Sequence, residues 1–382
     1  MSYNNIETAL IHGGISIDER TGAVNIPIYQ TSTFKQDGLG KMRGYEYSRT
    51  GNPTREALEA LIAELEGGHA GFAFASGLAA ETAVLSLLNT GDRVLISSNV
   101  YGGTFRLLSK IFNHFDINYT ISDTEDPAAF EKDITPDVKA VLIESPANPL
   151  MTITDIRAIS EIAHKHGLLV IVDNTFMTPY LQRPLELGAD IVIHSATKYL
   201  GGHSDVVAGL AVVKTQELTE KLAFIQNSTG GVLPPFDSFL LIRGIKVRLD
   251  RHVANAEAAA KYLTEHKAVK SVHYPGLPTD KGYEVNKRQA KNGGVMISFE
   301  LKDNYDINTF FESLELITLA ESLGGVESLV CHPSSMTHAS IPEEIRKKVG
   351  ITDGLIRLSI GIENIDDILN DLDQAITKSE VK

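Results

Sequence analysis

Between residues 70 and 213, short apolar runs rich in β-branched residues alternate with segments of helical length and pattern. Each run is long enough to form a strand and apolar enough to be buried. This alternation is typical of a mostly parallel sheet covered by helices, because parallel strands need crossover connections. We therefore predict an α/β fold with seven strands, at Phe72–Ala75, Arg93–Ser97, Ile117–Ser122, Ala140–Glu144, Leu168–Asp173, Ile191–His194 and Leu210–Val213, and with helices that include Ala79–Leu88, Thr104–Phe112 and Ile156–His166.

The pattern changes at Pro234 and Pro235, where a long amphipathic stretch, Phe239–His266, leads the chain away from the predicted sheet. Later runs at Gly294–Leu301 and Leu355–Ser359 predict strands, and Ile365–Ile376 predicts a closing helix. These elements indicate a smaller C-terminal α+β domain. We expect three parts in all: an irregular N-terminal arm at residues 1–50, a large domain at residues 51–245, and the C-terminal domain at residues 246–382.

Charge and hydropathy exclude several classes of partner. The chain has 35 Lys and Arg residues against 49 Asp and Glu residues, which gives a formal net charge of −14. This charge repels nucleic acid and anionic lipid at long range, so neither is an expected partner. No apolar run approaches the roughly 20 residues that span a bilayer, and Met1–Leu10 lacks the pattern of a secretory signal. We expect a cytoplasmic protein that does not enter a membrane.

Several common catalytic and binding motifs are absent from the sequence. A single cysteine, Cys331, excludes an internal disulfide and a thiolate metal site, and the 12 histidines form no H-E-x-x-H pattern. We therefore expect no metal. The glycines of Asp37–Gly44 do not match the dinucleotide fingerprint, there is no P-loop, and Ser76 lacks the upstream glycine of a nucleophile elbow.

Lys198 is the first candidate for chemistry. It follows the predicted strand Ile191–His194, and open α/β sheets bind ligands at the carboxyl ends of their strands. A lysine in this position could equally be a solvated surface charge. However, Ser195 and Thr197 offer hydroxyl groups suited to a phosphate, and the glycines that follow Lys198 allow close approach of the backbone.

Asp173 and the turn at Ser76–Leu78 complete a possible site. Asp173 ends an otherwise apolar strand, where an unpaired carboxylate would cost several kcal/mol, so it needs a partner. That partner could be a turn, an arginine or a protonated pyridine nitrogen. The turn at Ser76–Leu78 leads from a strand into a helix, where free amides favour an anion. An amine for an aldehyde, an acid for a ring nitrogen and an anchor for a phosphate are what pyridoxal phosphate requires.

The motifs resemble those of the Cys/Met-metabolism family of pyridoxal-phosphate enzymes, whose members handle cystathionine, homocysteine and methionine. The resemblance covers nearly the whole chain and implies the fold of the pyridoxal-phosphate aminotransferases, fold type I. It is carried by seven segments in the same order: Tyr47–Thr54, Phe74–Gly77, Tyr101–Thr104, Ser145–Pro149, Val172–Thr175, Ser195–Tyr199 and Arg357–Gly361.

The resemblance also implies roles for individual residues. Lys198 would bind the cofactor aldehyde and later move protons, Asp173 would keep the pyridine nitrogen protonated, and Tyr101 would stack on the ring and serve as an acid or base. The phosphate would be held by residues of this chain and by two residues from a neighbouring subunit of a homotetramer, a dimer of dimers. These are Gly77, Leu78, Ser195 and Thr197 from this chain, and Tyr47 and Arg49 from the neighbour.

The expected substrate is an amino acid. By the same resemblance, Arg357 would clamp its α-carboxylate with help from Asn148 and Ser322. Methionine γ-lyases carry a cysteine where Gly103 stands, which argues against methionine as the main substrate. Glu321 matches an acidic residue of the cystathionine γ-lyases and γ-synthases, and could orient the distal amino group of cystathionine.

We therefore expect γ-elimination of L-cystathionine to L-cysteine, 2-oxobutanoate and ammonia. Side activity as a β-lyase, or as a desulfhydrase that releases hydrogen sulfide from homocysteine or cysteine, is also expected. The alternatives within the family are a cystathionine β-lyase, and a cystathionine γ-synthase or O-acylhomoserine sulfhydrylase. An alternative of another class is an α/β protein that binds a metabolite without covalent catalysis.

Overall fold

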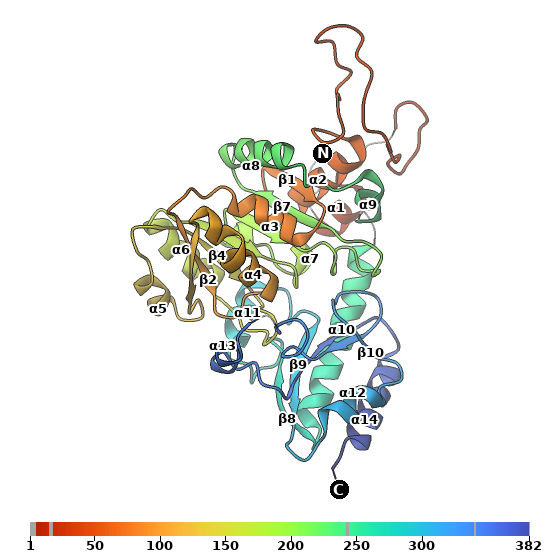
Figure 1. The fold of residues 1–382 in the computed structure, drawn as a ribbon. Coiled ribbons are helices and arrows are strands. Elements are labelled where there is room, and N and C mark those ends of the chain that lie inside the picture. Colours follow the sequence, from red (N-terminus) through yellow and green to blue (C-terminus); the bar gives the residue numbers. More distant parts are fainter. Residues whose placement is uncertain (1–4, 15–17, 242–243, 340, 382) are drawn as a thin grey trace.

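The computed structural model describes residues 5–14, 18–241, 244–339 and 341–381, and its larger sheet has seven strands in the order β1-β7-β6-β5-β4-β2-β3 (Figure 1). The strand β7 pairs antiparallel with both of its neighbours, and the other strand pairs are parallel. The predicted mostly parallel α/β sheet is thus confirmed. Its strands are β1 (Ala70–Phe74), β2 (Arg93–Ser97), β3 (Asn118–Ser122), β4 (Val138–Glu144), β5 (Leu169–Asp173), β6 (Ile191–His194) and β7 (Gly209–Val213).

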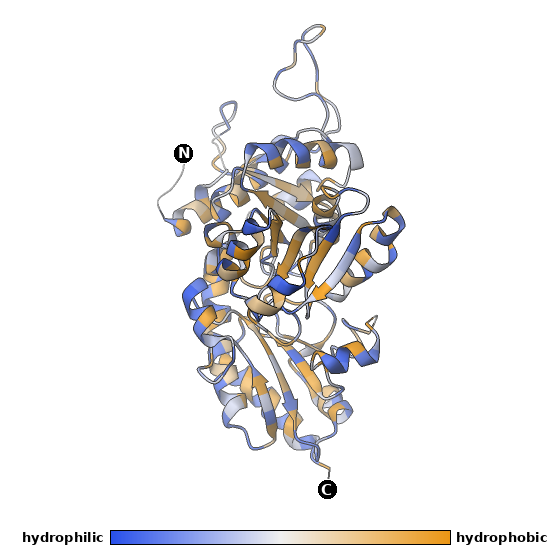
Figure 2. Ribbon diagram, turned by 90° about the vertical axis from the view of Figure 1, so that its left-hand side faces the viewer, coloured by the Kyte–Doolittle hydropathy of each residue, from blue (hydrophilic) through white to orange (hydrophobic). Residues whose placement is uncertain are grey.

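Both faces of this sheet are buried. In β4, Val141 and Ile143 belong to one hydrophobic cluster, whereas Ala140 and Leu142 belong to a second cluster on the opposite face. This explains why the strands read as continuous apolar runs rather than as alternating ones. In Figure 2 the central strands are mostly orange, and the covering helices are partly blue. These helices include α2 (Pro53–Glu66), α3 (Gly77–Leu85), α4 (Gly102–Lys110), α5 (Pro127–Lys132), α6 (Ile156–Lys165), α7 (Thr178–Leu181) and α8 (Gln216–Thr229).

The predicted strand positions hold to within two residues, whereas two helices begin earlier than predicted. The helix α3 starts at Gly77 rather than at Ala79, because the Ser76 side chain accepts a hydrogen bond from the Ala79 amide and caps the helix there. The helix α4 likewise starts at Gly102 rather than at Thr104. Both changes bring a helix start closer to the end of the preceding strand.

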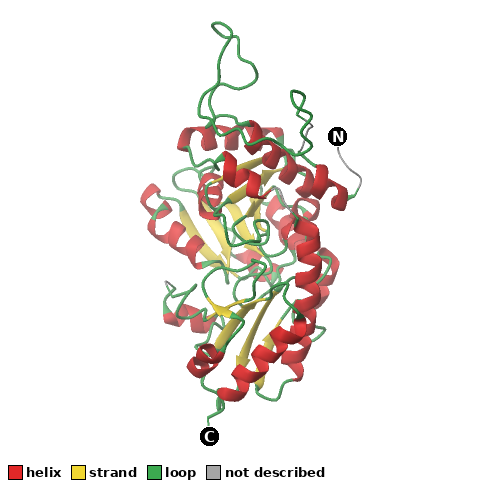
Figure 3. Ribbon diagram, turned by 90° about the vertical axis from the view of Figure 1, so that its right-hand side faces the viewer, coloured by secondary structure: helices red, strands yellow, loops and turns green. Residues whose placement is uncertain are grey.

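The second sheet has five strands in the order β10-β11-β12-β9-β8. These strands are β8 (Val269–His273), β9 (Met296–Leu301), β10 (Thr318–Leu319), β11 (Leu329–Cys331) and β12 (Leu355–Ser359). Helices α11 (Tyr283–Gln289), α12 (Ile307–Ser313), α13 (Glu343–Lys348) and α14 (Ile365–Lys378) belong to the same half of the chain. In Figure 3 the two sheets lie one above the other, with loops between them.

The amphipathic stretch predicted at Phe239–His266 is two helices rather than one. The helix α9 (Pro235–Leu241) ends before residues 242–243, which lie outside the described residues, and α10 (Ile245–Glu265) begins after Gly244. Gly244 has φ +59°, in the left-handed region that a continuing helix cannot use. The 21-residue helix α10 then runs alongside the second sheet.

The first fifty residues are mostly loop, but they are not wholly irregular. The helix α1 (Ile6–His12) buries Ala9 and Leu10, which the sequence analysis did not predict. Residues 18–50 then form long loops that project from the body of the chain (Figure 1). These loops are the projecting part of the predicted N-terminal arm, and from here on the arm means residues 18–50 only. No helix within the described residues is long and apolar enough to span a membrane.

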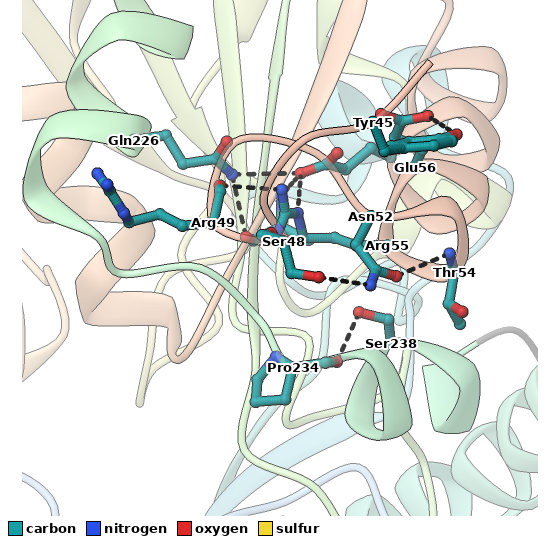
Figure 4. A network of polar contacts seen from close by, with 12 residues as sticks. Tyr45, Ser48, Arg49, Asn52, Thr54, Arg55, Glu56, Gln226, Pro234 and Ser238 are labelled. Atoms are coloured by element: carbon teal, nitrogen blue, oxygen red, sulfur yellow. Dashed lines mark hydrogen bonds and ion pairs between the residues drawn. The ribbon is translucent and has the colours of Figure 1, made fainter. Parts of the chain in front are cut away.

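Hydrogen bonds anchor the base of the arm to α2 (Figure 4). Asn52 donates to the Ser48 hydroxyl at 3.0 Å, and its side-chain oxygen accepts from the Thr54 amide, which caps α2. Arg55, 2% exposed, donates to the Ser48 carbonyl at 2.6 Å. These hydrogen bonds hold the turn at residues 48–52, which carries Arg49, against the start of α2.

Candidate active site

A cavity of about 560 Å³ lies at the carboxyl ends of β4, β5 and β6 and is closed from the other side by residues of the second half of the chain. Of the thirteen residues that the sequence analysis proposed for the site, eleven line this cavity. Tyr47 and Arg49 do not line it, and the Arg49 guanidinium donates instead to the Asn227 carbonyl at 2.5 Å. The eleven are Gly77, Leu78, Tyr101, Asn148, Asp173, Ser195, Thr197, Lys198, Glu321, Ser322 and Arg357.

Lys198 lies in the turn that follows β6, and its Nζ donates a 2.6 Å hydrogen bond to Oγ of Ser322. Burial, together with the smaller effect of the nearby positive charge of Arg357, lowers the pKa of Lys198 to about 8. A lowered pKa leaves more of the amine neutral near physiological pH. Only the neutral amine can attack an aldehyde, so this environment suits a nucleophilic lysine.

Asp173 is the last residue of β5 and is held by Thr175. The Thr175 amide donates to Asp173 Oδ1 at 2.9 Å, and the Thr175 hydroxyl donates to the same oxygen. Thr175 also accepts from the Ser195 amide at 2.8 Å, which ties the ends of β5 and β6 together. Burial raises the pKa of Asp173, against the lowering effect of these hydrogen bonds. No cationic side chain forms an ion pair with Asp173 in the described part of the chain.

The turn between β1 and α3 approaches the turn after β6 very closely. A Cβ atom placed on Gly77 would lie 2.8 Å from Cβ of Ser195, so only glycine fits there. Because the first amides of a helix have no partner within it, the amides of Gly77 and Leu78 are available for an anion. The Ser195 and Thr197 side chains line the same end of the cavity, with the Thr197 hydroxyl also bonded to the Ala208 backbone.

A second close approach fixes the other side of Lys198. Gly324 has φ +83°, and a Cβ atom on it would lie 2.7 Å from the backbone nitrogen of Tyr199. The loop after β10 thereby lies directly against the segment that carries Lys198. Ser322, in that loop, has φ +82°, which is unusual for a residue with a side chain and is a strained conformation.

Arg357 on β12 is 3% exposed and is held in a defined orientation. Its Nη1 donates to Asn148 Oδ1 at 2.9 Å, and its Nη2 donates to the Ser322 carbonyl at 3.0 Å. The three residues predicted to hold the substrate carboxylate are therefore in contact with one another. A planar guanidinium fixed on two sides is suited to bind a carboxylate.

The sequence analysis missed three charged residues that line the cavity: Glu81, Arg106 and Glu144. Glu144 is the most clearly engaged, because one carboxylate oxygen accepts from the Tyr101 amide and the other from the Asn148 amide, both at 2.9 Å. Glu144 is the last residue of β4 and lies directly opposite Asp173, the last residue of the parallel neighbour β5. An acidic residue at the end of each of two neighbouring apolar strands was the signal that could have identified Glu144.

The residues of the cavity fit pyridoxal phosphate. Lys198 supplies an amine with a lowered pKa for the aldehyde, and Asp173 supplies a partly buried carboxyl group for a ring cation. The Gly77–Leu78 amides and two hydroxyl groups supply donors for a phosphate. By contrast, the described residues contain no group of three or more His, Cys, Asp or Glu side chains arranged to hold a metal ion.

Comparison with known proteins agrees with this chemistry. The chain is 55% identical to a cystathionine gamma-lyase of Bacillus subtilis, over 97% of this chain and 98% of that protein. It is also 55% identical to a cystathionine beta-lyase of Lactococcus lactis, over 98% and 99% of the two chains. A cystathionine gamma-synthase of Mycobacterium tuberculosis is 48% identical over 97% and 96%.

A solved structure is equally similar. The crystal structure of cystathionine gamma-lyase from Lactobacillus plantarum complexed with L-serine superposes with a TM-score of 0.96 at 52% identity, covering 98% of this chain and 99% of that one. The model of a family described as Cys/Met metabolism PLP-dependent enzyme matches residues 7–377. The chain therefore belongs to this pyridoxal-phosphate-dependent family, among relatives that are cystathionine lyases and synthases.

Proposed function

We propose that this enzyme catalyses γ-elimination of L-cystathionine to L-cysteine, 2-oxobutanoate and ammonia, with slower release of hydrogen sulfide from homocysteine or cysteine. The observation that carries the proposal is that the cavity is lined by further charged groups besides the Arg357 clamp. Arg357 and Asn148 are bonded to each other and suit an α-carboxylate, and Glu321 and Arg106 also line the cavity and carry charges of opposite sign. Cystathionine has an ammonium and a carboxylate at each end, so its distal end could use these additional charges.

Gly103 supports the choice of substrate. A Cβ atom on Gly103 would lie 2.3 Å from the ring of Tyr101, so a side chain at this position would displace that ring. Methionine γ-lyases resemble this chain but carry a cysteine there. The position of Tyr101 in this enzyme thus depends on a residue that distinguishes it from enzymes acting on methionine.

The proposed roles of the residues follow from their placement. When bound, pyridoxal phosphate supplies an electron sink for the bond broken at Cα. Lys198 holds the cofactor and then carries the proton taken from the substrate, for which a pKa of about 8 is well matched. Asp173 keeps the ring nitrogen protonated by pairing its carboxylate with the ring cation. Tyr101 stacks on the ring and exchanges a proton with the leaving sulfur.

We further propose that the active sites are shared between subunits of a homotetramer, built as a dimer of dimers. Tyr47 is 46% exposed, and neither it nor Arg49 lines the cavity of its own chain. The arm to which they belong projects from the body of the chain (Figure 1), and in this proposal both residues serve the phosphate site of a neighbour. In this proposal residues 1–50 join subunits, residues 51–245 bind the cofactor, residues 246–382 clamp the substrate, and the enzyme is cytoplasmic.

Product analysis with L-cystathionine tests the reaction. Purified enzyme should produce 2-oxobutanoate and cysteine in equal amounts, identified by chromatography of the keto acids and thiols. Pyruvate and homocysteine as main products would show β-elimination instead. Incubation of an O-acylhomoserine with cysteine or sulfide provides the comparison, because faster formation of a thioether than of 2-oxobutanoate would identify a synthase or sulfhydrylase.

Mixing two inactive variants tests the shared site. Arg49→Ala and Lys198→Ala should each have little activity, and unfolding and refolding them together should restore part of it. Restoration occurs only if one chain supplies Arg49 and another supplies Lys198 to the same site. If the mixture stays as inactive as the separate variants while native gels show mixed oligomers, the shared site is wrong.

A further inference from the structure

Glu81 is a buried carboxyl group on the wall of the cofactor cavity, with no role in the proposed reaction. It lies on α3, one turn beyond Gly77, and is 5% exposed. Its Oε2 accepts a 3.0 Å hydrogen bond from the Thr104 hydroxyl on α4. The other oxygen, Oε1, is buried and finds no hydrogen-bond partner among the described residues. A buried carboxylate with one unsatisfied oxygen is costly unless it binds a proton or a ligand.

The electrostatic surroundings of Glu81 favour the protonated form. Burial raises its pKa to about 8, and the negative charge of Asp173 contributes in the same direction. Glu81 in turn contributes to the raised pKa of Glu144. The three carboxyl groups therefore influence one another in a single buried region, and not all of them can ionise at low cost.

The elements around α3 bring few other charges to this region. The strands β1 and β7 pack on α3 and carry no titratable residue, and the charged residues of α8 are exposed. His194 on β6 lies near Asp173, and its side chain is hydrogen-bonded to Glu66. Asp173 on β5 acts on Glu81 directly. The other titratable groups that line the cavity are Glu144 on β4, Tyr101 and Arg106 at and on α4, Lys198 after β6, Glu321 after β10 and Arg357 on β12.

We propose that Glu81 is a proton-exchanging group that couples cofactor binding to pH: it holds a proton while the site is empty and releases it to solvent when the pyridinium ring binds beside Asp173. Before binding, the Asp173 charge repels a second negative charge. After binding, the ring cation neutralises Asp173 and attracts a carboxylate, so Glu81 ionises. The inference rests on the cofactor of the family and not on which C–S bond the enzyme cleaves.

The direction of the effect follows from linkage. Because binding releases a proton, the affinity for pyridoxal phosphate should rise with pH while Glu81 is protonated in the empty site. The contribution of one proton is at most about tenfold in affinity per pH unit, and it should disappear above the pKa of about 8. Lys198 must also lose a proton to bind the aldehyde. This second contribution is the same in the wild type and in Glu81 variants, so it cancels in their difference.

Calorimetric titration of the cofactor-free full chain with pyridoxal phosphate tests the proposal. Titrations at pH 7 in two buffers of different ionisation enthalpy give the number of protons released per site. Glu81→Gln keeps the shape of the side chain and an oxygen for the Thr104 hydroxyl, but it cannot ionise. The variant should release fewer protons than the wild type, and its affinity should change less steeply between pH 6 and pH 8.

Two further variants make the test specific. In Thr104→Val the hydrogen bond that favours ionised Glu81 is lost, so the pH at which the affinity levels off should move upward. Glu217→Gln removes an exposed carboxylate on α8, with a side chain 77% exposed, and should behave as the wild type. Circular dichroism shows whether each variant is folded.

Equal proton release by folded Glu81→Gln and wild type would overturn the proposal. A uniform loss of affinity in Glu81→Gln at every pH would also overturn it, because that result indicates a purely structural role. Neither result bears on the reaction, which product analysis decides separately.

Discussion

Arg357 on β12 donates a 2.9 Å hydrogen bond from Nη1 to Oδ1 of Asn148, which lies beyond the end of β4 in the other sheet. The Asn148 amide is held in turn by Glu144, which also accepts from the Tyr101 amide. One chain of hydrogen bonds thus connects the proposed carboxylate clamp with the residue proposed to stack on the cofactor. Substrate binding and cofactor orientation are therefore expected to depend on each other.

Arg357→Lys should weaken substrate binding and leave the cofactor in place. Lysine keeps the charge but cannot donate to Asn148, to Ser322 and to a carboxylate in one plane. The loss of one or more charge-assisted hydrogen bonds, about 1.5–3 kcal/mol, corresponds to roughly a 10- to 150-fold lower kcat/KM. In steady-state kinetics most of the decrease in kcat/KM should appear as a higher KM. The absorption spectrum of the bound cofactor should be unchanged.

Arg288→Lys is the matched control for this measurement. Arg288 has a side chain 61% exposed and pairs with Asp155 outside the cavity, so its replacement should leave KM unchanged. An Arg357→Lys variant with normal KM would contradict the clamp.

Lys198→Ala should abolish covalent attachment of the cofactor. Reduction of the wild type with borohydride, followed by proteolysis and mass spectrometry, should find the cofactor mass on the peptide that contains Lys198. The variant should show no such adduct. Lys221→Ala, at an exposed position on α8, should retain it. An adduct on another lysine in the wild type would show that the assignment is wrong.

The lowered pKa of Lys198 predicts how the cofactor-free enzyme reacts with amine reagents. Below pH 8 the amine is mostly protonated and unreactive, so its rate of reductive methylation should rise with pH and level off near the pKa of about 8. Exposed lysines should continue to gain reactivity up to about pH 10. Peptide mass spectrometry at each pH distinguishes methylation of Lys198 from methylation of the exposed lysines. In Arg357→Gln the Lys198 curve should shift to higher pH, because a neighbouring positive charge is lost.

Asp173→Asn should stabilise the chain without cofactor and destabilise it with cofactor. A carboxyl group whose pKa is higher in the folded than in the unfolded state binds more protons when folded. Its contribution to the free energy of unfolding therefore decreases as the pH rises above 3.8 toward the raised pKa. At pH 7 and without cofactor, the variant should therefore melt at a higher temperature than the wild type, and this difference should narrow in acid.

With saturating pyridoxal phosphate the wild type should instead melt at a higher temperature than Asp173→Asn, because asparagine cannot pair with a ring cation. Thermal melts with and without cofactor measure both effects. If the cofactor raises the Tm of both proteins equally, Asp173 does not contact the ring nitrogen.

Glu321→Gln should lower activity on cystathionine specifically. If Glu321 binds the distal ammonium, the loss of about 0.5–1.5 kcal/mol at this exposed position corresponds to a roughly 2- to 10-fold lower kcat/KM. Elimination from O-acetyl-L-homoserine, which has no distal ammonium, should be unaffected. Glu315→Gln, with a side chain 75% exposed outside the cavity, is the control. Equal loss with both substrates would mean that Glu321 does not recognise the distal end.

Local features of the sequence were sufficient to predict much of the fold. Strands such as Arg93–Ser97 and Ile191–His194 begin and end where predicted, because apolar β-branched runs buried on both faces leave little ambiguity. The helix boundaries were less accurate. Ser76 caps α3 through one hydrogen bond, and Gly244 separates two helices inside a continuous amphipathic pattern; neither effect follows from periodicity.

The sequence was sufficient to predict site residues that lie at the end of a strand or just beyond it, such as Asp173 and Lys198. Glu144 shares with Asp173 the signal of an acidic residue at the end of an apolar strand, which was not used. Glu81 had no such signal, because a glutamate on a helix is usually exposed and only packing shows that this one is buried. The proposal that Tyr47 and Arg49 serve a neighbouring subunit comes from the family resemblance, because a single chain shows only that neither residue lines its own cavity.

The close contacts at Gly77 and Gly324 have a consequence for the mutational tolerance of this enzyme. Neither glycine has a functional group, yet a single methyl group at either position would collide with the backbone or side chains around Lys198. In a library of random variants selected for growth, both positions should accept glycine alone, while exposed residues of the arm such as Val24 and Leu39 should vary unless a neighbouring chain covers them. The pattern of permitted substitutions would therefore map the space around the cofactor and the surface of the assembly at the same time.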